Sequence, residues 1–253
     1  MDSQGLKVYW RPGCSSCVKV KEFLSGLGVP YESINVSAEP QAMDELRALG
    51  VRTVPVVARG SDYVFAQELA DVSRFIGREV TFRRLAAPEL MQKWLTVLEA
   101  SQRHVMQIPV EGLGERATPG RDRSVRDLAY HVYQVADAFL QAVQGGKEDL
   151  TAIYNAPPPA AVRTPEDIRQ YGAGVTERLR RWWAGVQDQS CSGTLLTYYG
   201  AQPLHHVLER CVWHSAQHAR QIIAVLDGLG VAADPPLTAK DYAGLPLPAG
   251  LWE

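Results

Sequence analysis

The spacing of hydrophobic positions along the chain changes after about residue 80. Up to residue 77, short runs rich in β-branched and aromatic residues alternate with stretches of helical period. The short runs predict four strands, over residues 6–10, 31–36, 55–58 and 62–66, of which the last two form a hairpin. Helices are predicted over residues 16–28, 39–50 and about 67–77. The order β-α-β-α-β-β-α is typical of a small α/β domain.

Beyond about residue 88, the pattern predicts helices and no convincing strand. Four apolar stripes with helical spacing cover residues 88–108, 124–145, 164–187 and 203–227. Ser124 with Asp127, and Thr164 before Pro165, are signals of helix starts. Four helices of about 20 residues with apolar stripes favour a four-helix bundle. The Pro-rich connection before Thr164 and the tail after residue 230 are expected to be irregular segments lying on this bundle.

The two patterns divide the chain into domains. We expect an α/β domain over 1–80, a linker over 81–87, an all-α domain over 88–230 and a Pro/Gly-rich tail over 231–253. With 46% hydrophobic and 21% charged residues, the composition is that of a soluble globular protein. A net charge of -2 without a basic patch argues against a nucleic-acid partner. The sequence has neither a signal core nor a long apolar run, so we expect a cytoplasmic protein without a membrane partner.

Two of the four cysteines, Cys14 and Cys17, form a CxxC pair directly after the first predicted strand. In a reducing compartment, such a pair indicates redox or metal chemistry. Free backbone N–H groups and the dipole at a helix N-terminus favour the thiolate of Cys14. Cys17, one turn later, is placed to attack a mixed disulfide on Cys14. The alternatives are half of a zinc site or an accidental spacing, although Cys191 and Cys211 are not spaced as a second pair.

A second feature of the first domain is Thr53-Val54-Pro55, before the third predicted strand. Together with the CxxC pair, it makes residues 6–77 similar to a glutaredoxin, which has the thioredoxin fold. The resemblance implies that Pro55 is cis and packs beside the cysteines, that the backbone of Val54 pairs with a thiol substrate, and that Cys14 is the nucleophile. It also implies a low-molecular-weight thiol as cofactor, with Thr53, Val54 and Pro55 in its binding site.

Two positions depart from the usual glutaredoxin pattern. The dipeptide between the cysteines is Ser-Ser, and Gln67 and Glu68 stand where glutaredoxins hold the carboxylate of glutathione. The expected cofactor is a low-molecular-weight thiol, glutathione or an analogue. Because of these two departures, an analogue, or electrons from a thioredoxin reductase-type donor, would fit as well as glutathione itself.

Three histidines of the second half lie on apolar stripes. His214 and His218 are four residues apart in the fourth predicted helix, so they share one face with Cβ atoms about 6 Å apart. His131 lies on the inward stripe of the second helix. Buried imidazoles without partners cost desolvation energy, and one divalent cation would satisfy all three. The pattern alone fits core histidines as well, and it leaves the roles of Cys211 and Arg220 open.

The stretches 124–140 and 205–222 together resemble the DinB-like superfamily, over roughly residues 88–229. Members of this superfamily are four-helix bundles with a three-histidine metal site. The resemblance implies that His131, His214 and His218 bind a divalent ion, with zinc or nickel expected first and iron or manganese as alternatives. It also implies low-molecular-weight thiols as reactants, in S-transfer or isomerisation.

Three functions fit these observations. The first is a metal-dependent, thiol-linked transferase, isomerase or detoxifying enzyme. In it the bundle activates a thiol for attack on an electrophile, and Cys14 and Cys17 act on a disulfide substrate. The second is a glutaredoxin-type disulfide reductase whose non-catalytic bundle serves for dimerisation, as in a homodimer, or for partner docking. The third, a metal-dependent hydrolase, lacks an identifiable general base.

Overall fold

The computed structural model describes residues 5–118, 120–145, 153–154 and 156–252. The chain divides into two compact units. The first, called the α/β unit below, consists of Met1–Arg83, Thr118–Arg121 and Pro248–Glu253. The second, called the helical unit, consists of Arg84–Ala117 and Asp122–Leu247. Among the described residues, no helix combines the length and the apolar character of a membrane span.

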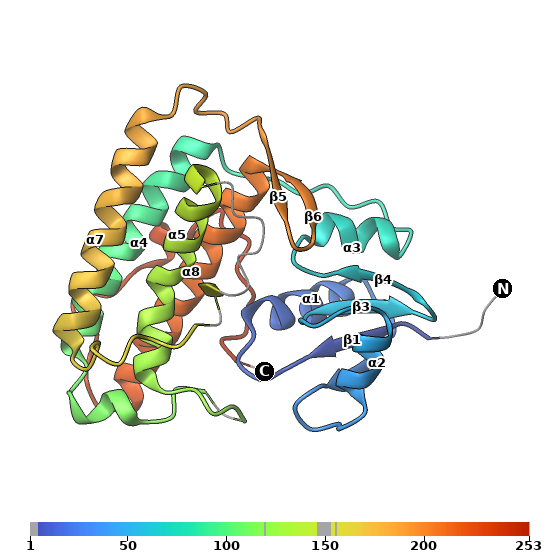
Figure 1. The fold of residues 1–253 in the computed structure, drawn as a ribbon, viewed down its shortest axis with the longest axis horizontal. Helices are drawn as coiled ribbons and strands as arrows, with labels where there is room; N and C mark the ends of the chain where they lie inside the picture. The colour runs from blue at the N-terminus through green and yellow to red at the C-terminus, as the bar shows by residue number, and fades with distance from the viewer. Residues whose placement is uncertain (1–4, 119, 146–152, 155, 253) are drawn as a thin grey trace. The chain divides into compact units, whose positions relative to one another are not determined.

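The α/β unit contains a four-stranded mixed sheet (Figure 1). Its strands are β1 (Lys7–Trp10), β2 (Glu32–Asn35), β3 (Val56–Arg59) and β4 (Asp62–Phe65), in the spatial order β2-β1-β3-β4. Strand β1 pairs in parallel with β2 and antiparallel with β3, while β3 and β4 form the predicted hairpin. The helices are α1 (Ser15–Gly26), α2 (Ala42–Ala48) and α3 (Leu69–Phe75). The α/β architecture predicted for this part is confirmed.

The core of the α/β unit consists of two clusters, because successive strand residues point to opposite faces of the sheet. One cluster joins β1 and β3 to α1 and α3, and it includes Val8, Val57, Val20, Leu24 and Val72. The other joins the same two strands to α2, and it includes Tyr9, Val56, Ala42, Leu46 and Cys17. One cysteine of the CxxC pair is thus part of the hydrophobic core, which holds the first turn of α1 in place.

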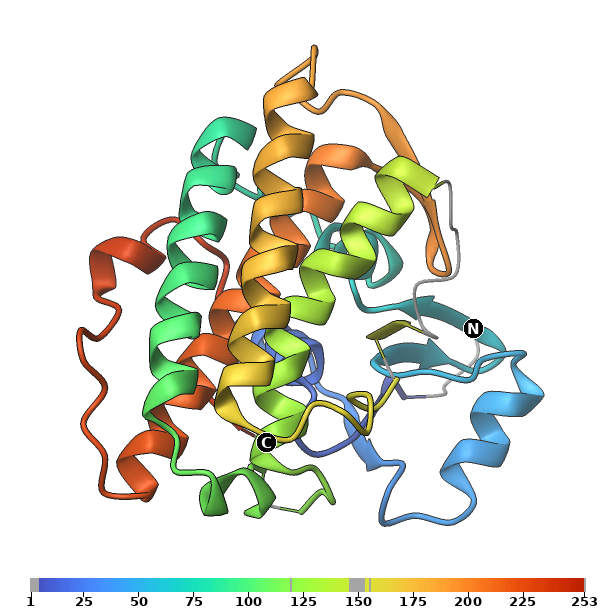
Figure 2. The same cartoon turned by 60° about the vertical axis from the view of Figure 1, so that its left-hand side comes forward.

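Four long helices form the core of the helical unit (Figures 1 and 2). They are α4 (Ala87–Gln107), α5 (Val125–Gly145), α7 (Pro165–Gly185) and α8 (Leu204–Gly228), and a short 3₁₀ helix, η1 (Glu111–Gly114), follows α4. Helices α4 and α5 each pack against both α7 and α8. The rings of Trp94, Phe139 and Trp182 meet edge to face, with centroids 5.4 and 5.1 Å apart. The predicted four-helix bundle is confirmed.

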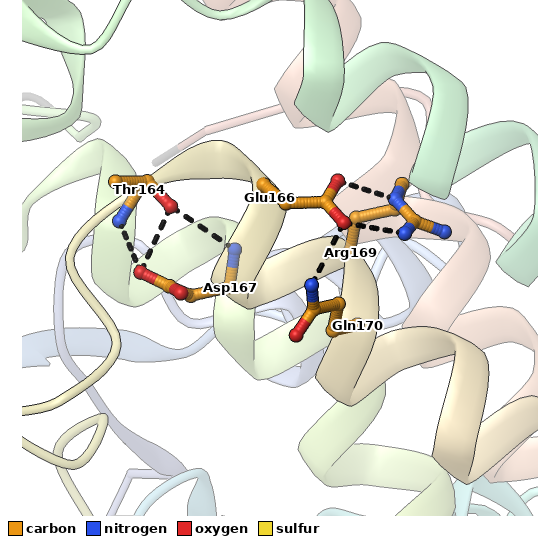
Figure 3. A network of polar contacts seen from close by, with 5 residues as sticks. All are labelled: Thr164, Glu166, Asp167, Arg169 and Gln170. Atoms are coloured by element: carbon orange, nitrogen blue, oxygen red, sulfur yellow. Dashed lines mark hydrogen bonds and ion pairs between the residues drawn. The ribbon is translucent and has the colours of Figure 1, made fainter.

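The start of α7 shows how local sequence sets a helix boundary (Figure 3). The N–H of Asp167 donates to Oγ1 of Thr164 at 3.1 Å, and the N–H of Thr164 donates to Oδ2 of Asp167 at 2.8 Å. These two bonds form a capping box. In the same turn, Arg169 and then Gln170 donate to the Glu166 carboxylate and lower its pKa to about 2. The predicted helix start at Thr164 is therefore correct.

The helical unit also contains a hairpin that the sequence pattern did not predict. Strands β5 (Thr194–Thr197) and β6 (Gly200–Pro203) pair antiparallel across a turn at Tyr198 and Tyr199. The expectation of no strand beyond residue 88 was therefore wrong. Most residues of both strands are exposed or half-buried, so burial imposes little alternation of polar and apolar positions on them. Gly200, at a φ of 105°, lets the chain leave the turn.

The tail after α8 differs in part from the irregular segment expected on the bundle. It contains one short helix, α9 (Ala239–Tyr242). Nε2 of His104 in α4 donates to the carbonyl of Pro235 at 2.8 Å, so this portion does lie on the bundle. Residues from Pro248 onward belong to the α/β unit instead. There the N–H groups of Ala249 and Gly250 each donate to the Glu22 carboxylate of α1 at 2.8 Å.

Candidate functional site

The cysteine pair lies at the turn between β1 and α1, where the sequence placed it. Cys14 is the N-cap of α1, and the N–H of Cys17 donates to its Sγ at 3.2 Å. The two residues form a disulfide, with Cα atoms 5.2 Å apart. Cys14 is half-buried, whereas Cys17 is fully buried. An incoming thiol or disulfide can therefore meet Cys14, while Cys17 approaches Cys14 from the protein interior.

Thr53, Val54 and Pro55 form the turn that leads into β3. The peptide bond between Val54 and Pro55 is cis, in agreement with the resemblance to glutaredoxins. Val54 belongs to the same hydrophobic cluster as Cys17, and Cys14 packs against that cluster. The turn is thus close to the cysteine pair, and its role in binding a thiol stays a prediction.

A segment that the sequence did not connect with the cysteines lies against the loop before Cys14. Thr118 and Gly120 are part of the α/β unit. A Cβ added to Gly13 would lie 2.6 Å from Cγ2 of Thr118, and one added to Gly120 would lie 3.4 Å from Pro12. Gly13 has a φ of 68°, so neither its conformation nor its surroundings accept a side chain. No sequence motif signals this approach between residues about 100 positions apart.

Gln67 and Glu68, which depart from the glutaredoxin pattern, stand at the start of α3. Glu68 is the N-cap of that helix, and its Oε1 accepts a hydrogen bond from the N–H of Ala70 at 3.1 Å. Gln67 is buried. A protein carboxylate thus already occupies the helix N-terminus, where the carboxylate of a ligand would otherwise meet free N–H groups.

The bundle brings the three predicted histidines together within the helical unit. His131 comes from α5, and His214 and His218 come from α8. One potential ligand atom from each lies within 4.8 Å of the others. The ring centroid of His218 is 4.9 Å from that of His131 and 4.8 Å from that of His214. Residues four apart on α8 share one face, and the packing of α5 against α8 adds the third imidazole.

Two glutamines orient two of these imidazoles. Nδ1 of His131 lies 3.2 Å from Oε1 of Gln134, and Nδ1 of His218 lies 2.6 Å from Oε1 of Gln221. An amide oxygen only accepts, so Nδ1 donates in both rings and the lone pair of each neutral imidazole is on Nε2. The His-x-x-Gln spacing could have been found in the sequence, because the side chains of residues three apart meet on a helix.

The amide of Gln134 is held in place from its other side. Its Nε2 donates to the carbonyl of Ala156 at 2.9 Å and to that of Ile153 at 3.3 Å. This orientation leaves Oε1 directed at His131, because the amide nitrogen is engaged by two acceptors. The position of the imidazole therefore depends on a segment outside the four long helices.

The three imidazoles have the chemistry of ligands for a divalent cation. Burial, and then the neighbouring His218 and Arg210, hold the pKa of His214 well below its usual range, so this ring is neutral at pH 7. Its Nδ1 is buried and has no hydrogen-bond partner among the described residues, which is costly unless a ligand binds there. Neutral imidazoles are common ligands of zinc and of other divalent first-row metals, so this set of nitrogen donors fits such an ion.

Three further side chains lie next to this histidine cluster: those of Cys211, Tyr154 and Arg210. Sγ of Cys211 is 3.8 Å from the hydroxyl of Tyr154, whose ring centroid is 6.4 Å from that of His131. Cys211 is fully buried, and burial raises the pKa of its thiol. The group of potential metal ligands found in the described part of the chain does not include it. The sequence analysis did not predict that Tyr154 and Arg210 lie beside the histidines. For Arg210, the four-residue spacing to His214 was a signal in the sequence, because residues four apart share one face of a helix.

Comparison with known proteins finds matches for both halves. The glutaredoxin family model matches residues 6–64, and the model of the DinB superfamily matches residues 93–222. N-acetyl-S-hydroxy-L-cysteine reductase of Bacillus subtilis (strain 168) is 40% identical over 65 residues, which cover 24% of this chain and 70% of that protein. Glutaredoxin-like protein NrdH of Salmonella typhimurium is 38% identical over 55 residues, which cover 22% of this chain and 68% of that protein.

Among solved structures, one from Bacillus subtilis is similar to this chain. It is YfiT, described as a probable metal-dependent hydrolase with an unusual four-helix bundle topology. The sequences are 18% identical, the TM-score is 0.43, and the match covers 61% of this chain and 96% of YfiT.

Proposed function

Because the chain belongs to the DinB superfamily over residues 93–222 and carries a glutaredoxin domain over residues 6–64, we propose that it is a thiol-linked enzyme with two reaction centres. The helical unit activates a low-molecular-weight thiol at a divalent metal ion, for S-transfer, isomerisation or detoxification. The α/β unit performs thiol–disulfide exchange with Cys14 and Cys17.

The observation that carries the proposal is the convergence of His131, His214 and His218, with potential ligand atoms within 4.8 Å of one another. These residues would hold the ion. When bound, a divalent ion with open coordination positions stabilises a thiolate at neutral pH. Gln134 and Gln221 contribute by holding the Nδ1 protons of two rings, which keeps the Nε2 lone pairs available.

The cysteine pair supplies the redox step. The Cys14 thiolate attacks one sulfur of a disulfide between two small thiols, so that a Cys14–sulfur bond forms and one small thiolate leaves. The Cys17 thiolate then attacks Sγ of Cys14, which forms the intramolecular disulfide and releases the second small thiolate. Both electrons come from the cysteine pair, and a thioredoxin reductase-type donor returns them. The similarity to a reductase of a cysteine derivative supports a small sulfur compound as the substrate.

Metal analysis of the protein purified without a histidine tag tests the first centre. We expect close to one divalent ion per chain in the wild-type protein. The triple variant His131→Ala, His214→Ala, His218→Ala should contain none and should retain disulfide reduction, because the cysteines belong to the other unit. A full metal content in the triple variant would refute the site. A wild-type protein that contains no metal and forms a stable dimer would favour a non-catalytic bundle.

A further inference from the structure

We propose that the loop 115–125 limits the cysteine pair to disulfides of small thiols, because its tip covers surface on which a protein disulfide would have to lie. The tip consists of Thr118–Arg121, which belong to the α/β unit, and it is called the loop tip below. The inference rests on the proposed redox function and names the class of disulfide that this site accepts. The loop tip acts as a barrier and has no part in the exchange itself.

The first support is the burial of the chain on both sides of Cys14. Pro12 and Gly13, before it, are buried, and so are Ser15 and Ser16, after it. Cys14 itself is half-buried. A thiolate attacks along the line of the S–S bond that it breaks, and a disulfide in a protein carries chain on both of its sides. Such a substrate needs accessible surface around the nucleophile, whereas a small disulfide needs access to one sulfur only.

The second support is the closeness of the loop tip to this surface. A Cβ added to Gly13 would lie 2.6 Å from Cγ2 of Thr118, and one added to Gly120 would lie 3.4 Å from carbon atoms of Pro12. Thr118 is 1% exposed, and its Oγ1 has no hydrogen-bond partner among the described residues. The contact with Gly13 is therefore one of packing. A protein chain that approached from this side would have to displace the loop tip.

The third support is the way in which the loop is held. The N–H of Ala117 donates to the carbonyl of Arg123 at 2.9 Å. Arg116 and Ser124, one position further from the tip, form an antiparallel bridge. Pairing of this kind holds the two arms of a loop together, as in a β-hairpin. Displacing the loop tip therefore costs free energy, because the arms fix where it can lie.

A second segment of the α/β unit, the end of the chain, covers α1 close to the cysteines. A Cβ added to Gly250 would lie 3.4 Å from Cγ1 of Val18, the residue after Cys17. The N–H of Gly250 donates to Oε1 of Glu22 on the same helix at 2.8 Å. The chain end and the loop tip thus each occupy surface next to the cysteine pair.

Two disulfides that differ in size test the inference. The full-length protein, reduced beforehand, is mixed with bis(2-hydroxyethyl) disulfide or with insulin. In both reactions the thiols of Cys14 and Cys17 are oxidised to one disulfide, and the substrate disulfide is reduced to two thiols. Alkylation and mass spectrometry follow the loss of protein thiols, and each rate constant is divided by that of dithiothreitol with the same disulfide. We expect this normalised rate constant to be about 100-fold larger for the small disulfide.

Changes in the loop tip assign the preference to it. In one variant, an Asn-Gly turn replaces residues 118–122, because the hydrogen bond between Ala117 and Arg123 suits a two-residue hairpin turn. This variant should raise the rate constant for insulin about 10-fold and keep that for the small disulfide within about twofold. Thr118→Gly, which removes the side chain against Gly13, should shift the ratio in the same direction. Thr118→Val is the matched control, because valine keeps the shape of threonine, and it should keep the wild-type ratio.

The outcomes separate the inference from the function on which it rests. A wild-type protein with equal normalised rate constants for the two disulfides would overturn the inference and leave thiol–disulfide exchange standing. The same holds if neither the shortened loop nor Thr118→Gly raises the rate constant for insulin. A reduced wild-type protein that reacts with neither disulfide faster than Cys14→Ser would overturn the proposed redox function, and the inference with it.

Discussion

Individual side chains decide which atoms of the histidine cluster are available to a ligand. Three positions on α5 and α8 show the spacing His-x-x-Gln, and in two of them the glutamine oxygen accepts from Nδ1 of the histidine. In the third, Gln217 accepts from Arg220 instead. The inward stripes of the sequence predicted that the histidines meet, but not which amide each ring would find, because that choice depends on rotamers within a packed core.

Replacing Gln134 by leucine tests this orientation. We expect Gln134→Leu to weaken metal binding about 10- to 100-fold, because Nδ1 of His131 loses its acceptor and the ring loses its fixed orientation. The affinity is measured by competition with a chromophoric chelator.

The matched control for this variant is Gln141→Leu. Gln141 lies on the same helix, and its Nε2 donates to Oδ2 of Asp137 at 3.2 Å. This variant should bind metal as the wild-type protein does. If Gln134→Leu also bound metal with unchanged affinity, the amide would have no part in positioning His131.

At the scale of helices and strands, long periodic segments were predicted best. All four bundle helices lie where their apolar stripes placed them, because each buries a continuous face over about 20 residues. The shorter elements were predicted less well: α2 was expected over residues 39–50 and covers Ala42–Ala48. The β5–β6 hairpin was missed, since strands of four mostly exposed residues show no clear period.

Alanine substitutions at two glycines of α7 are expected to have opposite effects on stability. A Cβ on Gly172 would lie 2.6 Å from ring atoms of Tyr133, which is fully buried. We therefore expect Gly172→Ala to lower the free energy of unfolding by about 1–3 kcal/mol. A Cβ on Gly174 would have no neighbour within 4 Å. Gly174→Ala should therefore raise the free energy of unfolding by up to about 1 kcal/mol, because alanine has a higher helix propensity than glycine.

Thermal unfolding followed by circular dichroism at 222 nm measures both glycine variants. The melting temperature should fall for Gly172→Ala and rise slightly for Gly174→Ala. Equal melting temperatures for the two variants would mean that α7 does not pack closely on α5 at this position.

At the scale of the whole molecule, the two candidate centres belong to different units. The cysteines are in the α/β unit and the histidines are in the helical unit, each with its own core. The two proposed chemistries are therefore expected to be separable by mutation.

Replacing Cys14 by serine tests whether the two candidate centres act independently. Cys14→Ser should abolish disulfide reduction, because the half-buried sulfur that we propose as the nucleophile is lost, and it should leave the metal content unchanged. Cys17→Ser should retain reactions that need only one thiol. Disulfide reduction by Cys14→Ser at the wild-type rate would show that Cys14 is not the nucleophile, and a loss of metal in this variant would contradict the independence of the two centres.

By itself, the sequence determined the two-part architecture, the position of Cys14 and Cys17 at a helix start, and the inward direction of the three histidines. These properties depend on local periodicity and on short spacings, which are written in consecutive residues. Only the tertiary structure decided that Thr118 lies against Gly13, that Gln134 is held from residues 153 and 156, and that Tyr154 and Tyr199 flank Arg210. Such contacts join segments far apart in the chain, and their partners are selected by packing, which a local pattern does not encode.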